Sequence, residues 1–255
     1  MCLINIKYHI VILICLILLV LGANAQVVNI ENRRLDKTNN GWFGTGELAL
    51  GLIRNQNSAV NFATRISMLY GKDKHRYLLM TDAAINQSNL GNIESTGWFH
   101  FRYNYLAKEN FSWEGFAQTL FSQQMRLYPR YTIGAGARYK VFQTDSLKLY
   151  VGSSLMFEHE NLQNPVSSYS SERLTFYFSW VWINKTDFTV DWMFLYQPRL
   201  FNFSDNRLQT EIRSEARINR QFRMRIQLSL LYDSDPPANV PRLFMNSRTG
   251  LMINF

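Results

Sequence analysis

The chain has 255 residues, with 27 Lys and Arg against 19 Asp and Glu, and its formal net charge is +8. Its mean hydropathy is slightly negative, which excludes a polytopic helical membrane protein, because such a protein needs several apolar runs of about 20 residues. The 18 Phe, 13 Tyr and 6 Trp exclude a disordered or low-complexity chain.

The first 25 residues show the charged, apolar and small-residue order of a secretory signal peptide. Lys7 precedes an apolar run over residues 10–21, and a small-residue site ends at Ala25. A single transmembrane anchor is the alternative, but it needs a longer apolar run than these twelve residues. Cleavage after Ala25 would leave residues 26–40 as a short periplasmic lead-in. Both cysteines of the chain lie in the removed segment, so the exported protein cannot depend on disulfides.

From residue 41 to the end, apolar and polar residues alternate with a period of two, which is the pattern of β-strands with two different faces. In the clearest segment, Phe176 and Phe178 fall on one face, while Arg173 and Thr175 fall on the other. Twelve such segments are predicted, at residues 44–54, 59–70, 75–86, 97–106, 111–121, 125–140, 147–158, 172–182, 187–197, 206–218, 221–233 and 243–255.

An even number of antiparallel strands of 10 to 15 residues predicts a closed, all-β transmembrane barrel over residues 41–255. Short turns alternate with longer connections, predicted at residues 87–96, 159–171, 198–205 and 234–242. With a periplasmic N-terminus, the short turns face the periplasm and the long connections face outward. Closure explains stability without disulfides, since an open strand edge would leave unpaired backbone groups in hydrocarbon.

A soluble β-sandwich or a lipocalin-like barrel is the alternative, because it alternates as well. Twelve strands exceed what a small soluble barrel needs, and the polar faces are rich in Arg and small polar residues where a solvated surface is rich in Lys and Glu. Phe255 ends the last predicted strand on its apolar face. A terminal aromatic residue in this place resembles the signal that the outer-membrane assembly machinery reads. Aromatic residues recur near predicted strand ends, as interfacial girdles would place them: Trp42, Tyr70, Tyr77, Trp98, Trp113, Tyr196 and Tyr232.

The polar phase of the strands predicts a charged lumen. Its candidate lining residues are Arg102, Glu114, Arg126, Arg130, Arg138, Arg173, Asp187, Asp191, Arg207, Glu211, Arg213, Glu215, Arg217, Arg223 and Arg225. Two interpretations stay open. In one, the side chains form a salt-bridge network that fills or narrows the lumen. In the other, the arginine surplus lines a pore that prefers anions.

Catalytic, metal and nucleic-acid sites are not predicted. Outer-membrane lipid enzymes use a His with a nearby Ser, and His75, His100 and His159 each lack Ser two positions away. Glu158 and Glu160 flank His159, but this loose spacing is more typical of a solvated loop than of a metal site. No phosphate-binding glycine loop or other cofactor motif occurs. The basic residues are spread along strands, so membrane lipid and lipopolysaccharide are the expected anionic partners.

Several short motifs carry a family resemblance. They include Phe101-Arg102-Tyr103-Asn104-Tyr105, Trp113-Glu114-Gly115-Phe116-Ala117-Gln118, Ile133-Gly134-Ala135-Gly136-Ala137-Arg138, Tyr196-Gln197-Pro198 and Leu231-Tyr232-Asp233-Ser234-Asp235-Pro236-Pro237. In this order, the sequence resembles the Gram-negative family of salt-induced outer-membrane proteins, particularly its Bacteroidetes-type members. The resemblance implies an outer-membrane barrel, and it assigns no activity and no catalytic residue.

Together these patterns predict an outer-membrane barrel of a Gram-negative bacterium, narrow and arginine-lined, that serves envelope integrity or limited passage of small solutes and anions. The alternatives are an outer-membrane enzyme acting on lipid or lipopolysaccharide, and a closed structural or binding barrel. The solute and the oligomeric state are left open.

Overall fold

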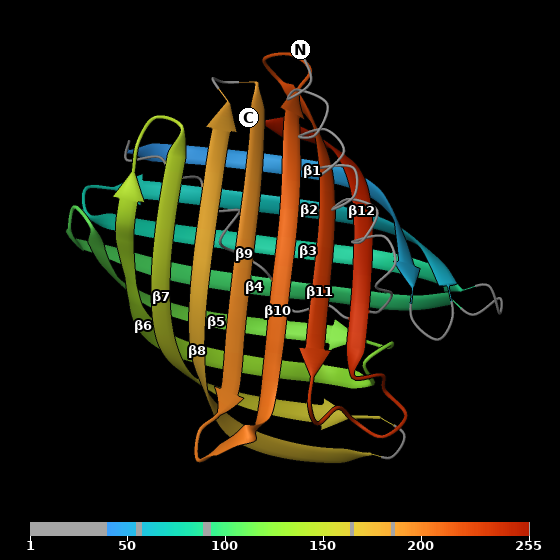
Figure 1. The fold of residues 1–255 in the computed structure, drawn as a ribbon. Helices are drawn as coiled ribbons and strands as arrows, with labels where there is room; N and C mark the ends of the chain where they lie inside the picture. Colours follow the sequence, from blue (N-terminus) through green and yellow to red (C-terminus); the bar gives the residue numbers. More distant parts are fainter. Residues whose placement is uncertain (1–39, 55–57, 89–92, 164–165, 185–186, 255) are drawn as a thin grey trace, which may run out of the picture.

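The computed structural model describes residues 40–54, 58–88, 93–163, 166–184 and 187–254. These residues form one closed barrel of twelve antiparallel strands (Figure 1), which confirms the predicted fold class. The predicted signal peptide, nearly all of the lead-in and Phe255 lie outside the described residues. The strands are β1 (Gly41–Arg54), β2 (Ser58–Lys72), β3 (His75–Ser88), β4 (Ile93–Lys108), β5 (Phe111–Ser122), β6 (Leu127–Gln143), β7 (Leu147–Leu162), β8 (Ser167–Asn184), β9 (Phe188–Arg199), β10 (Asn202–Arg217), β11 (Phe222–Asp233) and β12 (Leu243–Asn254).

Each strand pairs with its neighbours in sequence, and β1 pairs with β12 to close the sheet. This last ladder runs from the pair Thr45 and Asn254 to the pair Arg54 and Met245. Because β1 and β12 pair with each other, neither terminal strand is left as an open sheet edge.

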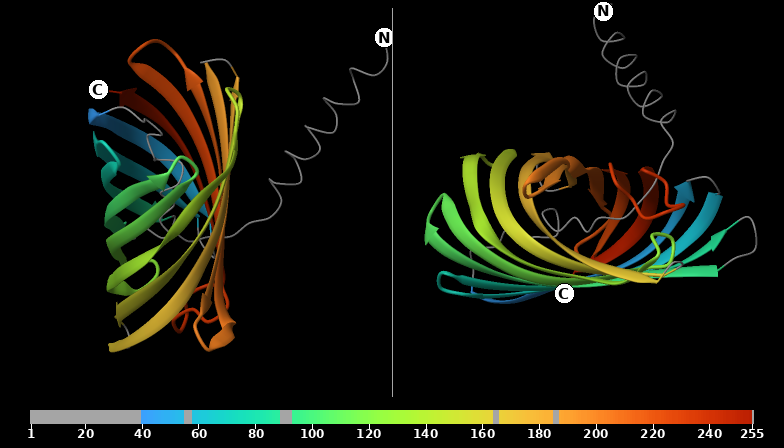
Figure 2. Two further views of the ribbon diagram at one scale, coloured as in Figure 1. Left: turned by 90° about the vertical axis from the view of Figure 1, so that its left-hand side faces the viewer. Right: turned by 90° about the horizontal axis from the view of Figure 1, so that it is seen from below.

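Strands of the front wall, from β7 to β12, run steeply across those of the back wall, from β1 to β5 (Figure 1). Such crossing follows from the strand tilt that closing a sheet requires. Both views in Figure 2 show that the barrel is flattened from front to back. The flattening brings side chains of opposite walls within reach of each other.

The barrel has two ends with different connections. We call the end where β1 begins and β12 ends the terminal rim; it carries the turns β2–β3, β4–β5, β6–β7, β8–β9 and β10–β11. The other end is the opposite rim. Within the described ranges, no helix is long and apolar enough to cross a membrane.

Three of the four long connections predicted at the opposite rim are wrong. Only residues 234–242 form a long loop there, whereas most of residues 87–96, 159–171 and 198–205 extend β3, β4, β7, β8, β9 and β10. The predicted strands stopped where the apolar face ended. The ladders continue further because inward ion pairs and backbone hydrogen bonds replace the apolar face as the source of stability.

The two faces of the barrel are inverted relative to a soluble protein. Among the described residues, 35 buried side chains are polar or charged and 19 are hydrophobic. Large hydrophobic side chains are exposed on the outside of all twelve strands, for example Leu50 on β1, Ile133 on β6 and Ile226 on β11. A soluble barrel would bury its apolar face and expose its polar one. This distribution therefore favours a lipid-facing exterior.

Candidate functional site

Arg207 on β10 holds an ion-pair network inside the barrel near the opposite rim. Its Nη1 lies 2.9 Å from Glu158, and its Nη2 lies 2.8 Å from Glu160, both on β7. Its Nε lies 2.8 Å from Asp233 at the end of β11. All four side chains are nearly inaccessible to solvent. One guanidinium thus ties together strands β7, β10 and β11.

Two further arginines extend this network across the lumen. Arg173 on β8 donates from Nε to Glu158 at 2.6 Å and from Nη2 to Asp205 at 2.7 Å. Arg130 on β6 lies 2.5 Å from Glu160. Buried charges are costly unless they are paired and hydrogen-bonded, and here each guanidinium meets at least one carboxylate.

A second network crosses the seam between β1 and β12. Glu47 on β1 accepts hydrogen bonds from Arg65 on β2, at 3.1 Å, and from Arg225 on β11. Arg225 also lies 2.6 Å from Glu215 on β10, and Arg65 donates to Gln227 at 2.7 Å. The side chains therefore join β2 to β11 over the two strands between them.

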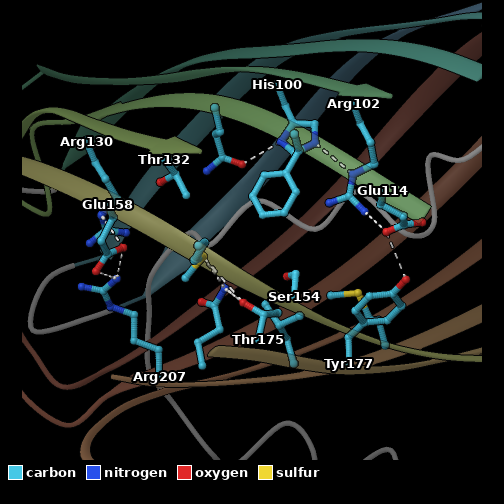
Figure 3. A pocket seen from close by; sticks show the side chains of 16 residues that line it. His100, Arg102, Glu114, Arg130, Thr132, Ser154, Glu158, Thr175, Tyr177 and Arg207 are labelled. Carbon is cyan, nitrogen blue, oxygen red and sulfur yellow. Dashed lines mark hydrogen bonds and ion pairs between the residues drawn. The ribbon is translucent and has the colours of Figure 1, made fainter. Parts of the chain in front are cut away.

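A cavity of about 70 Å³ lies between the walls beside the first network (Figure 3). On its far side Arg102 pairs with Glu114 at 2.9 Å, and the Tyr177 hydroxyl donates to the same carboxylate at 3.4 Å. His100 Nδ1 lies 3.0 Å from Gln118. Both polar and apolar side chains, Met156 and Leu195 among the latter, line the cavity, which has room for a few water molecules.

An apolar cluster fills the lumen next to these polar groups. It joins β2 to β6 with β11, β12 and two connections of the opposite rim, through Leu69, Leu78, Met80, Trp98, Leu120, Met125, Leu127, Leu231, Val240 and Phe244. Trp98 was predicted to lie in an outer aromatic girdle, and this prediction is wrong. Its side chain points inward and is 5% exposed, because it shares the phase of His100 and Arg102 on β4.

The structure buries ten of the fifteen predicted lumen residues inside the barrel: Arg102, Glu114, Arg130, Arg173, Asp191, Arg207, Glu211, Arg213, Glu215 and Arg225. Arg138 is half-buried and lies over the ring of Tyr150, and Arg126 lies in the β5–β6 turn. Asp187, Arg217 and Arg223 lie at the terminal rim, where the side chains of Asp187 and Arg217 are 74% and 36% exposed.

The buried charges nearly cancel. Among the described residues, nine arginines and ten acidic residues are buried. The arginine surplus that the sequence shows therefore lies mainly at the rims, where solvent screens it.

Sequence reasoning missed several inward residues. Glu47 and Arg248 are buried. Alternation along their strands could have revealed both, because Glu47 on β1 is out of phase with outward Leu50, and Arg248 on β12 is out of phase with outward Leu251. Glu160 was assigned to a loop because β7 was ended too early. The apolar cluster was not predicted, since Trp98 was expected in an outer girdle and Val240 in an outward loop.

His159 points away from the two glutamates that flank it. Glu158 and Glu160 face the lumen, whereas His159 lies on the outer face with Phe157. The three side chains therefore do not converge. Within the described ranges, no group of three or more His, Cys, Asp or Glu residues could hold a metal ion.

On the outer face, strand register brings a serine to His159. Ser170 on β8 lies directly opposite His159 on β7, and His159 Nδ1 is 2.9 Å from its Oγ. A groove of about 420 Å³ begins at His159 and is lined by apolar side chains that include Tyr131, Ile133 and Phe157. The pair is eleven residues apart in sequence, so local spacing could not reveal it.

The family described as "Protein of unknown function, DUF481" matches residues 47–255. The chain belongs to this family. The match begins within β1 and extends over β2 to β12. It therefore covers the part of the chain that was predicted to form the barrel. The description names no activity, so the salt-induced name stays a prediction. No curated protein sequence matches significantly.

Solved structures share the barrel at low sequence identity. The structure of the NanC porin has 10% identity and a TM-score of 0.58, over 82% of this chain and all of that one. The translocator domain of the autotransporter NalP from Neisseria meningitidis has 8% identity and a TM-score of 0.56, over 88% and 91%. An outer-membrane channel from Pseudomonas putida F1 has 8% identity and a TM-score of 0.54, over 90% and 100%. At such identities the likeness concerns the fold alone.

Proposed function

We propose that this chain is an outer-membrane barrel of a Gram-negative bacterium, with the terminal rim on the periplasmic side. The inverted distribution of polar and apolar side chains supports a lipid-facing exterior, and the similar solved barrels include a porin and an outer-membrane channel. Export through a signal peptide at residues 1–25 and recognition of Phe255 by the assembly machinery are parts of this proposal.

The lumen is a narrow and mostly filled one, suited to envelope integrity with at most limited passage of water and small ions. One observation carries this proposal: the apolar cluster joins β2 to β6 with β11 and β12 across the lumen and lies beside the buried ion-pair networks. Any larger solute would have to separate Trp98, Leu120 and Phe244. Because the buried charges nearly cancel, a preference for anions would come from the rims.

Single-channel recording of the refolded mature chain in a planar bilayer tests this proposal. We expect small or absent current steps for the natural chain, and larger steps for Phe244→Ala, which thins the apolar cluster. Phe62→Ala is the matched control, because its ring is on the outer face. Large steps of the natural chain, unchanged by Phe244→Ala, would refute a filled lumen.

A gradient of KCl in the same experiment tests the charge argument. An anion preference set by the rims should weaken as salt is raised, since exposed charges are screened beyond about 10 Å at 0.1 M. It should also decrease in Arg217→Glu, whose side chain lies at the terminal rim. A strong preference that neither change alters would place the selective charges inside the lumen.

The His159–Ser170 pair favours a second candidate function, hydrolysis of acyl esters in lipid or lipopolysaccharide of the adjoining leaflet. Ser170 Oγ would attack the ester carbonyl carbon while His159 takes its proton and passes it to the departing alcohol. Water then cleaves the acyl-serine and restores the hydroxyl. The groove at His159 would hold the acyl chain, and Glu172 lies on the same face two residues beyond Ser170.

A fluorophosphonate probe and lipid mass spectrometry test this second candidate on the folded barrel in vesicles. We expect labelling and release of fatty acid by the natural chain, and loss of both in Ser170→Ala. Ser168→Ala on the same strand is the control. Absence of labelling and release in the natural chain would eliminate the candidate.

A further inference from the structure

Every lysine that the structure describes lies at one end of the barrel. Lys72 and Lys74 are at the β2–β3 turn, Lys108 ends β4, and Lys140 and Lys148 flank the β6–β7 turn. All five are therefore within a few residues of the terminal rim. None of the described lysines lies at the opposite rim.

Exposed charges at the two rims differ accordingly. The terminal rim adds three arginines to these lysines, Arg217, Arg220 and Arg223, against four acidic residues in its turns, Asp73, Glu109, Asp145 and Asp187. The opposite rim carries Arg126, Arg199 and Arg242 against Glu172 and Asp235. Among the described residues the terminal rim thus has an excess of four positive charges, and the opposite rim an excess of one.

Aromatic rings form a row just inside the terminal rim. Trp42 on β1 contacts Tyr70 on β2 at 4.7 Å between ring centres, and the row continues through Tyr77 and Tyr103, 5.3 Å apart, on β3 and β4. Trp113, 56% exposed, continues it on β5. Exposed aromatic rings of this kind lie at the headgroup level of a membrane.

The lysines lie on the far side of this row from the middle of the barrel. Lys72 pairs in register with His75, whose Nδ1 is 2.8 Å from the Tyr103 hydroxyl, and Lys108 pairs with Phe111. A lysine beyond an aromatic row can lay its methylene chain along the rings and reach the phosphate plane with its ammonium group. The order of ring then ammonium therefore matches the order of ester region then phosphate in a lipid.

From this arrangement we infer that the terminal rim binds the phosphate groups of anionic phospholipids in the adjoining leaflet. The inference rests on the proposed membrane location, and it adds which lipid the barrel selects and at which rim. Charge complementarity sets the selection, because zwitterionic headgroups carry a compensating ammonium and would gain less from the excess of four positive charges.

Tryptophan quenching by brominated lipids tests the inference. The mature chain is refolded in phosphatidylcholine vesicles that contain either brominated phosphatidylglycerol or brominated phosphatidylcholine at equal mole fraction. Trp42 and Trp113 report on lipid at the terminal rim. We expect about fivefold stronger association of the anionic lipid, decreasing as KCl is raised.

Two matched variants locate the effect. Lys72→Gln, Lys74→Gln and Lys108→Gln together should abolish the preference. Arg126→Gln, Arg199→Gln and Arg242→Gln together change the charge equally at the opposite rim and should retain it. Equal quenching by both lipids in the natural chain, or equal losses in both variants, would overturn the inference. Absence of quenching by either lipid would instead refute the membrane location itself.

Discussion

Replacing Arg207 with methionine should destabilise the barrel more than any other single change in the first network. The guanidinium meets Glu158, Glu160 and Asp233 at 2.8 to 2.9 Å, and its side chain is 3% exposed. Methionine fills much of the same volume but donates no hydrogen bond. Glu158 and Glu160 would keep other arginines, whereas Asp233 would lose its guanidinium partner.

The magnitude follows from the burial of the pairs that break. Removing one partner of a buried ion pair costs about 3–5 kcal/mol, because the other charge stays buried without compensation. Arg217 is the control, since its pair with Asp187 is long, at 3.9 Å, and largely exposed. An exposed pair of this kind contributes about 0–1 kcal/mol, so Arg217→Met should change stability little.

Urea unfolding from lipid vesicles, followed by tryptophan fluorescence, measures both variants against the natural chain. A third variant adds Asp233→Asn to Arg207→Met, which removes the uncompensated charge and should recover part of the loss. Equal stabilities of Arg207→Met and Arg217→Met would refute the reasoning, because buried and exposed pairs would then contribute alike. Failure of Asp233→Asn to restore any stability would show that the loss does not arise from stranded charge.

Three further changes probe packing and the membrane-facing surface. Gly136→Ala should lose at least about 2 kcal/mol, because its new Cβ would lie 2.1 Å from the Ser153 carbonyl oxygen, whereas Gly115→Ala has open space and should be tolerated in the same urea experiment. Phe244→Ala should cost about 3–5 kcal/mol by emptying part of the apolar cluster, and the gel shift on heating should occur at a lower temperature. Ile226→Arg, on the outer face near the middle of β11, should cost about 2–4 kcal/mol in vesicles; a change within about 0.5 kcal/mol would indicate that this face meets water.

The twelve strands could be predicted because alternation is a local property of the sequence. On β8, Phe176 and Arg173 must face opposite sides whatever the rest of the chain does, since successive side chains of a strand point in opposite directions. The inward placement of Arg207, Arg213 and Arg225 follows from the same phase. The short turns of the terminal rim followed as well, because they separate runs of alternation.

Boundaries and apolar lumen residues could not be predicted in this way. The ends of β7 and β8 depend on inward Glu160 and on the ladder between the two strands, which composition does not show. Trp98 and Phe244 have the composition of lipid-facing residues. They share the inward phase of His100 and Arg248 on the same strands, but only the closed sheet shows that they meet other apolar side chains across the lumen.

By itself, then, the sequence determined that this protein is a barrel of twelve strands with one apolar and one charged face, because both properties follow from residue alternation along single strands. The tertiary structure decided what the charges do. It joined Arg207 to carboxylates from two other strands, brought apolar side chains of opposite walls together, set Ser170 opposite His159 and gathered the described lysines at one rim. These contacts depend on strand register and on the curvature of the closed sheet, which no local stretch of sequence specifies.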